Sequence, residues 1–109
     1  MEYIISGRVI KGDSYGRKIG FPTINLETTV KTLPPDGVYA GLGTLDGKEY
    51  HAGIVIGPEG RVEAHLIGYN GDAYGKEATL KIEKFLREYK KFETEKELIE
   101  QIEKDIKMC

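Results

Sequence analysis

The residues best suited to chemistry lie in residues 20–25, where Thr23 and Asn25 follow Pro22. Proline fixes its φ angle, which limits the freedom of the chain that presents the threonine hydroxyl and the asparagine amide. In an extended segment, residues two apart point to the same side. Both oxygens can then meet one Mg²⁺ ion, which takes a few protein oxygens together with phosphate oxygens and water. The alternative is a turn in which both side chains bond their own backbone.

A glycine-rich loop precedes this segment. Gly12, Gly16 and Gly20 are spaced four apart, and Arg17 and Lys18 lie between the last two. Glycines let backbone N–H groups approach an anion without interference from Cβ, and an arginine fork can contact two phosphate oxygens. Together with the oxygens that follow, the loop indicates a site for polyphosphate and a hard metal ion, and hence phosphoryl transfer. A surface loop with solvated cations is the alternative interpretation.

Glu63 is a third candidate, because it lies in the middle of an alternating segment. Val62 and Ala64 fall on one face of the expected strand, and Glu63 and His65 fall on the other. A carboxylate that faces a cleft can accept the proton of an attacking hydroxyl, whereas one that faces water is only solvated. Arg87 stands among aromatic residues, where it can stack on a planar ligand or extend along the end of a barrel.

Short segments with strand character must position these residues. Five of them show alternation or β-branched residues between turn signals: residues 3–10, 38–45, 48–56, 61–67 and 77–86. Asp46 and Gly47 predict a tight hairpin, since both central positions of a type I′ turn need positive φ. The glycine loop and the Pro22 segment are expected to be irregular, and residues 57–60 to form a tight turn. Closure hides sheet edges, so we expect a small antiparallel barrel of five or six strands.

The last segment changes to a helical period. Thr94 followed by Glu97 is a capping box, which predicts that a helix begins there. Leu98, Ile102 and Ile106 recur every four residues and form one apolar stripe of an amphipathic helix. We expect this helix to cover one side or one mouth of the barrel.

Length and composition limit the class of protein. The 109 residues suit one domain, which we place at residues 1–109, and 31% of them are charged, as in a globular chain. The net charge of −2 argues against nucleic acid as a required partner. Cys109 is the only cysteine and cannot form an intramolecular disulfide. We expect no membrane association, since no apolar stretch reaches spanning length, and the cytoplasm is the expected compartment.

Several short motifs follow one another along the chain. They comprise Gly7, Val9 and Gly12, then residues 16–25 and 33–39, Glu63 with His65, residues 72–75 and 85–92, and a closing helix that ends at Asp105. This succession covers nearly the whole chain. It resembles the riboflavin kinase (flavokinase) family, which also occurs as the kinase module of bifunctional bacterial FAD synthetases.

The resemblance implies a six-stranded antiparallel Greek-key barrel with one C-terminal α-helix. It also implies the reaction of riboflavin with ATP, in the presence of Mg²⁺, to give FMN and ADP. Glu63 matches the catalytic carboxylate of the family, and Thr23 and Asn25 match the pair that binds phosphate and Mg²⁺. The other matches are Gly12 and Arg17 in the nucleotide loop, where we also place Gly16 and Lys18, Tyr74 on the nucleotide side, and Arg87 on the flavin side.

The chain departs from the family pattern at residues 57–60, where a minimal turn replaces a longer connection that lines part of the site. The adenylyltransferase domain of the bifunctional relatives is absent from this sequence. Three alternatives to an ATP-dependent kinase stay open: a non-catalytic barrel that binds flavin or nucleotide, a structural or interaction barrel that binds neither, and a flavokinase that uses another donor such as CTP. A monomer is expected.

Overall fold

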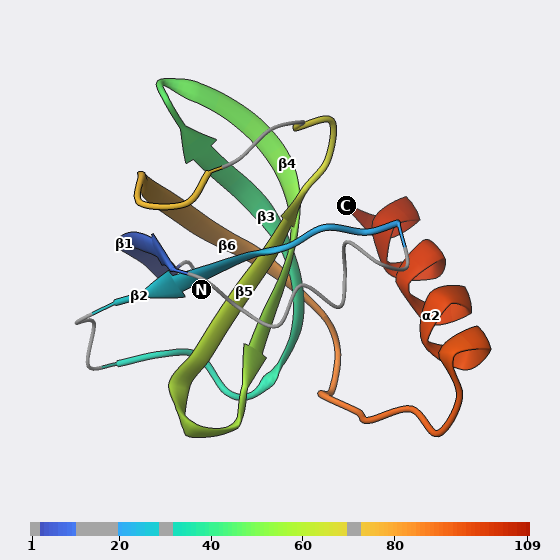
Figure 1. Cartoon of the computed structure of the whole chain (residues 1–109). Coiled ribbons are helices and arrows are strands. Elements are labelled where there is room, and N and C mark those ends of the chain that lie inside the picture. Colours follow the sequence, from blue (N-terminus) through green and yellow to red (C-terminus); the bar gives the residue numbers. More distant parts are fainter. Residues whose placement is uncertain (1–2, 11–19, 29–31, 70–72) are drawn as a thin grey trace.

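The computed structural model describes residues 3–10, 20–28, 32–69 and 73–109 of the chain. Within these residues it has six β-strands and one α-helix, with a short 3₁₀ turn at Pro58–Gly60 (η1). The strands are β1 (Tyr3–Ile10), β2 (Ile24–Glu27), β3 (Gly37–Leu45), β4 (Lys48–Gly57), β5 (Arg61–Leu66) and β6 (Glu77–Arg87). The helix α2 spans Glu95–Met108 (Figure 1).

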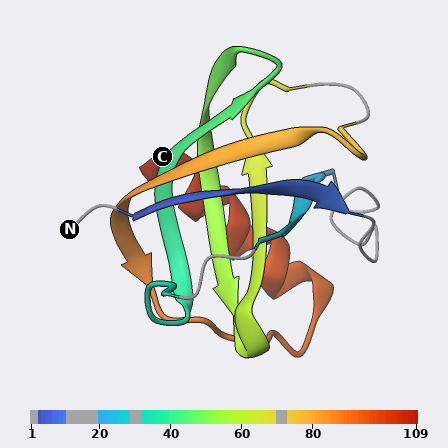
Figure 2. The ribbon, with the colours of Figure 1, turned by 90° about the vertical axis from the view of Figure 1, so that its left-hand side faces the viewer.

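The six strands close into one barrel in the order β1-β2-β5-β4-β3-β6, and every neighbouring pair is antiparallel. Strands β3, β4 and β5 follow one another, and β6 then returns to lie beside β3. This arrangement is a Greek key. Figure 2 shows strands crossing in front of and behind one another, as expected of a closed sheet. The expected six-stranded antiparallel Greek-key barrel with a C-terminal helix is therefore confirmed.

The core fills the inside of the barrel because every second residue of a strand points inward. Ile5, Ile54 and Leu80, from three different strands, are fully buried there. On β5 the inward residues are Val62 and Ala64, with Leu66 after them. The intervening residues of β5 therefore face outward.

The β3–β4 hairpin has the predicted turn. Asp46 has φ of 52° and Gly47 has φ of 76°, as a type I′ turn requires. The prediction of an irregular Pro22 segment is wrong at its end, because Ile24 and Asn25 begin strand β2. This strand has only four residues and only one buried side chain, Leu26, so it carries almost no periodic signal. Its pairing with β1 and β5 nevertheless closes the barrel.

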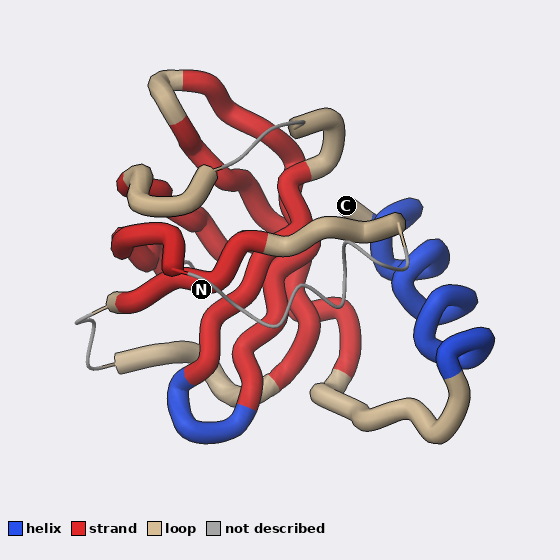
Figure 3. Tube along the Cα trace, in the orientation of Figure 1, coloured by secondary structure: helices blue, strands red, loops and turns tan. Residues whose placement is uncertain are grey.

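Helix α2 begins where the capping box predicted. The backbone N–H of Glu97 donates to the hydroxyl of Thr94 over 3.2 Å. Figures 1 and 3 show the helix on the outside of the barrel, beside β4 and away from β1. Among the described residues, no helix combines the length and apolar character needed to cross a membrane.

Candidate active site

A groove of about 510 Å³ lies between the outer face of the barrel and α2, and we call it the α2 groove. Its floor comes from β4 and β5. Its walls come from Phe21 and Thr23, from α2, and from the segment that connects β6 to the helix. This connection, residues 88–94, we call the wall segment, and its residues 89–94 line the groove. A groove of this size lies within the range of about 300–1,000 Å³ typical of small-molecule sites.

One half of the α2 groove is apolar. The predicted stripe of α2 faces it through Leu98, Ile102 and Ile106, and Val55 lies on the opposite floor. All four side chains are only partly buried. The stripe therefore does not close tightly onto the barrel, and it leaves an apolar slot between helix and sheet.

The other half of the groove carries Glu63 and Thr23. In the pairing of β2 with β5, Asn25 lies directly opposite Glu63. Side chains of directly opposed residues extend from the same face of a sheet, with Cβ atoms about 4.5–5.5 Å apart. The structure thus places the side chains of Asn25 and Glu63 next to each other on the outer face, and of these two only Glu63 lines the groove. The carboxylate is 20% exposed, and its Oε2 lies 4.0 Å from Nε of Arg61.

The segment that carries Thr23 is fastened to β5. Nδ1 of His65 lies 2.7 Å from the carbonyl oxygen of Pro22. Since a carbonyl only accepts, this hydrogen bond requires the proton on Nδ1. The ring of Phe21 also packs edge-on against His65, with centroids 6.0 Å apart. His65 therefore has a structural role, and it helps to set the position of Thr23 beside the groove.

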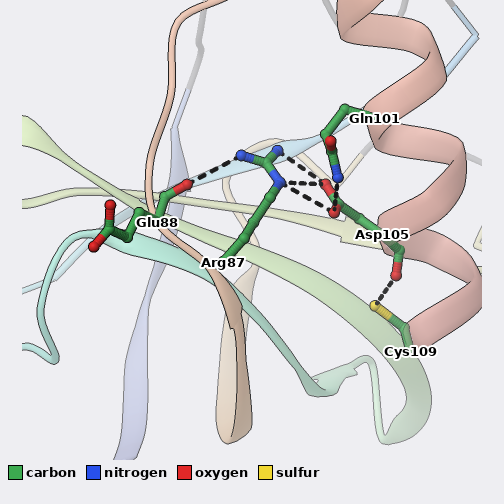
Figure 4. Close-up of polar contacts among 5 residues, drawn as sticks. All are labelled: Arg87, Glu88, Gln101, Asp105 and Cys109. Atoms are coloured by element: carbon green, nitrogen blue, oxygen red, sulfur yellow. Dashed lines mark hydrogen bonds and ion pairs between the residues drawn. The ribbon is translucent and has the colours of Figure 1, made fainter.

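Arg87 borders the groove but also ties α2 to the end of β6 (Figure 4). Its Nε and Nη2 donate to the carboxylate of Asp105, and its Nη1 donates to the carbonyl oxygen of Glu88 over 3.2 Å. The guanidinium also lies 5.5 Å from the centre of the Phe92 ring. The position of Arg87 is thus fixed by contacts within the protein.

The C-terminal residue joins the same cluster. The Sγ of Cys109 donates to the backbone carbonyl oxygen of Asp105 over 3.2 Å. Burial is the main cause that raises the pKa of the Cys109 thiol, and the nearby Asp105 carboxylate adds to it. The thiol is therefore held in its protonated form.

The structure does not bring every predicted residue to this groove. Tyr74 is 63% exposed in a turn next to β1, where the N–H of Gly75 donates to the carbonyl oxygen of Val9. That turn lies on the side of the barrel away from α2 (Figures 1 and 2). Gly12, Gly16, Arg17 and Lys18 lie outside the described residues.

Sequence reasoning missed three residues that shape the groove: Arg61, Tyr89 and Asp105. A signal for Asp105 was present, because position 105 follows Leu98 by seven residues and so lies on the apolar face of the helix. A carboxylate on such a face needs a partner. No comparable local signal marks Arg61 or Tyr89.

The fold and the groove define a small closed barrel with a ligand-sized site between the sheet and its C-terminal helix. A family model described as Flavokinase, riboflavin kinase, matches residues 1–109. The chain belongs to the riboflavin kinase family.

Individual relatives agree with this assignment. The chain is 42% identical over 116 residues to a bifunctional riboflavin kinase/FMN adenylyltransferase of Bacillus subtilis, covering 94% of this chain and 36% of the relative. It is 35% identical over 112 residues to the RNA-binding riboflavin kinase RibR of the same organism, covering 94% of this chain and 48% of that relative. The chain thus spans between about a third and a half of the length of these relatives.

Solved structures share the fold. A crystal structure described as a macrolide-efflux protein from Streptococcus pneumoniae superposes with a TM-score of 0.89 at 28% identity, covering 95% of this chain and 37% of that one. The riboflavin kinase of Trypanosoma brucei gives a TM-score of 0.72 at 20% identity, covering 98% and 74%. At that identity the second likeness shows the fold alone.

Proposed function

We propose that the protein is a riboflavin kinase, which transfers the γ-phosphoryl group of ATP to the 5′-hydroxyl of riboflavin and forms FMN and ADP. The observation that carries this proposal is the pairing of Glu63, which lines the polar half of the α2 groove, with Asn25 on the adjoining strand. A carboxylate and an amide side chain thus extend from neighbouring strands, and the carboxylate lies next to a slot with apolar walls.

The apolar half of the groove suits the flavin ring. Flat aromatic ligands bind in clefts lined by hydrophobic and aromatic side chains with a few polar groups. Val55 and Ile102 supply the two apolar faces, and Phe92 supplies an aromatic edge. Arg87 lies beside this part of the groove, held by Asp105, and is proposed to contact the flavin side of the site.

The polar half of the groove suits the reacting hydroxyl. In this proposal Glu63 accepts the proton of the 5′-hydroxyl as its oxygen attacks the γ-phosphorus in line, and ADP leaves with the electron pair of the broken P–O bond. A positioned general base contributes about 10²–10⁴-fold. Holding the hydroxyl and the phosphorus in register contributes up to about 7–11 kcal/mol in favourable cases.

The side chains of Thr23 and Asn25 offer the neutral oxygens that Mg²⁺ accepts alongside phosphate and water. They would hold the ion, which neutralises charge on the phosphoryl oxygens when bound. Within the part of the chain that the structure describes, no three His, Cys, Asp or Glu side chains gather as a metal cluster. A site of few protein oxygens therefore fits the residues present better than an all-carboxylate cage.

The phosphates of the nucleotide are assigned to the glycine loop on sequence grounds. Gly12, Gly16, Arg17 and Lys18 are proposed to cradle them, and Tyr74 to lie on the nucleotide side. That nucleic acid is not a partner stays a prediction, since one relative is named as an RNA-binding riboflavin kinase.

A single assay tests the proposed function. The purified protein is incubated with riboflavin, Mg²⁺ and one nucleoside triphosphate at a time, and FMN is followed by chromatography. We expect FMN with ATP. FMN formed only with CTP would show that ATP is not the donor. Riboflavin binding without FMN from any donor would reject kinase activity in favour of a flavin-binding barrel.

A further inference from the structure

The wall segment is joined to the barrel by side chains. Among the described residues, no backbone–backbone hydrogen bond connects residues 88–93 to a strand. The Arg87–Asp105 pair ties the start of the connection, at the end of β6, to the later part of α2. Within the wall segment, Phe92 lies against the guanidinium of Arg87, and a further side-chain contact reaches the floor of the groove.

Arg61 makes that contact. Its Nη2 donates to the hydroxyl of Tyr89 over 2.8 Å, and its guanidinium carbon lies 5.9 Å from the centre of the Tyr89 ring. Arg61 is the first residue of β5, directly after the short turn, and Tyr89 lies in the wall segment. A strand on the floor of the groove is thus joined to the far wall.

Gly57 makes room for this arginine. In the β4–β5 pairing Gly57 lies opposite Arg61. A Cβ at position 57 would lie 3.2 Å from Nε and 3.3 Å from Nη2 of Arg61, tighter than ordinary contact. The glycine at the end of β4 therefore leaves space for the guanidinium to extend across the strand toward Tyr89.

The same guanidinium lies beside the candidate base, with Nε 4.0 Å from Oε2 of Glu63. The Arg61 side chain is 48% exposed, so this ion pair by itself contributes little. The hydrogen bond to Tyr89 is the shorter and better directed contact. Arg61 is therefore placed to hold the wall segment through Nη2, while its Nε faces the Glu63 carboxylate.

We propose that Arg61 is a positioning residue of this chain, which fastens the wall segment to β5 through Tyr89 and thereby sets how tightly the α2 groove holds its ligand. The identity of that ligand as a flavin rests on the proposed function. The fastening itself does not, because it concerns contacts within the protein.

Proteolysis by endoproteinase Lys-C measures the fastening directly. Lys90 and Lys91 are exposed and follow Tyr89 in the wall segment, and this enzyme cuts at lysine, so changing Arg61 leaves its sites unaltered. Cleavage of a transiently opened segment follows the population of the open form. For Arg61→Ala we expect cleavage at these two sites about 5-fold faster than in the unsubstituted protein, the factor of one ordinary hydrogen bond. The matched control is Arg8→Ala, an exposed arginine on β1, which should cleave at the original rate.

A double-substitution cycle shows whether the effect passes through Tyr89. Tyr89→Phe keeps the ring and loses the hydroxyl that makes this hydrogen bond, so cleavage should rise by about the same factor. Combined with Arg61→Ala it should add nothing further, because both changes remove the same contact. Additive effects, or cleavage of Arg61→Ala at the unsubstituted rate, would overturn the proposal.

Ligand measurements complete the test. In Arg61→Ala we expect the KM for riboflavin to rise about 5-fold with kcat nearly unchanged, and the dissociation constant to rise with it. A fall in kcat at constant KM would overturn the proposal, since it would assign Arg61 to the chemistry of Glu63. If neither the unsubstituted protein nor any variant binds riboflavin, but the cleavage rates change as expected, the contact between Arg61 and the wall segment is confirmed and the proposed function is rejected.

Discussion

Replacing Asp105 by alanine tests whether one ion pair holds α2 to the barrel. The Asp105 carboxylate accepts hydrogen bonds from Nε and Nη2 of Arg87, the shortest at 2.9 Å, and from Nε2 of Gln101 at 3.0 Å. The Arg87 side chain is 22% exposed and that of Asp105 is 12% exposed. Removing the carboxylate leaves a largely buried guanidinium without its anion.

The expected cost lies between two limits. Removing one partner of a fully buried ion pair costs about 3–5 kcal/mol, whereas a fully exposed pair contributes about 0–1 kcal/mol. Because the pair is mostly but not wholly buried, we expect Asp105→Ala to lower the free energy of unfolding by about 2–3 kcal/mol. The higher helix propensity of alanine offsets at most about 0.7 kcal/mol of this.

Urea unfolding followed by circular dichroism measures this loss, with the free energy extrapolated linearly to water. The matched control is Glu103→Gln, an exposed carboxylate on the same helix, which should stay within about 0.5 kcal/mol of the unsubstituted protein. If Asp105→Ala unfolds at the same urea concentration as Glu103→Gln, the reasoning is refuted and the apolar stripe alone holds the helix.

Three further predictions concern the barrel, the helix cap and the C-terminus. Gly41→Ala should lower the free energy of unfolding by about 3 kcal/mol or more, because a Cβ there would lie 2.0 Å from the carbonyl oxygen of Lys81; an unchanged urea midpoint would contradict the close approach of β3 and β6. Thr94→Ala should cost about 1 kcal/mol in the same measurement, and Thr94→Ser should restore most of it, since the serine hydroxyl can also accept from Glu97. Because folding raises the pKa of the Cys109 thiol, its contribution to stability is present below the ordinary thiol value of 9.0 and is lost as the pH rises through the folded value. A Cys109→Ser variant should lack this alkaline loss in urea titrations at pH 8 and pH 10, and equal losses in both proteins would contradict the assignment.

Local signals predicted most of the fold. The Asp46–Gly47 turn and the Thr94 cap depend on backbone chemistry within four residues, so the sequence contains everything needed to find them. Strand β2 was missed because its four residues carry almost no periodic signal and its pairing partners, β1 and β5, are distant in sequence. The order of strands around the barrel depends on that pairing and cannot be obtained from periodicity.

The site was predictable in its residue types and less so in its contacts. Alternation along β5 shows that Glu63 lies on the opposite face from Val62, but only the position of α2 shows that this outer face borders a groove. The contact of Arg87 with Asp105 joins residues 18 positions apart across a non-repeating connection. Such pairs depend on how the wall segment turns, which no local pattern encodes.

The most direct test of the account is the turnover of Glu63→Gln, a change that keeps the size of the side chain and removes the base. We expect kcat for FMN formation to fall by about 10²-fold or more, with the dissociation constant for riboflavin nearly unchanged. Glu27→Gln, an exposed carboxylate on neighbouring β2, should retain full activity. A Glu63→Gln protein that forms FMN at the unsubstituted rate would contradict the assignment of this carboxylate as the base.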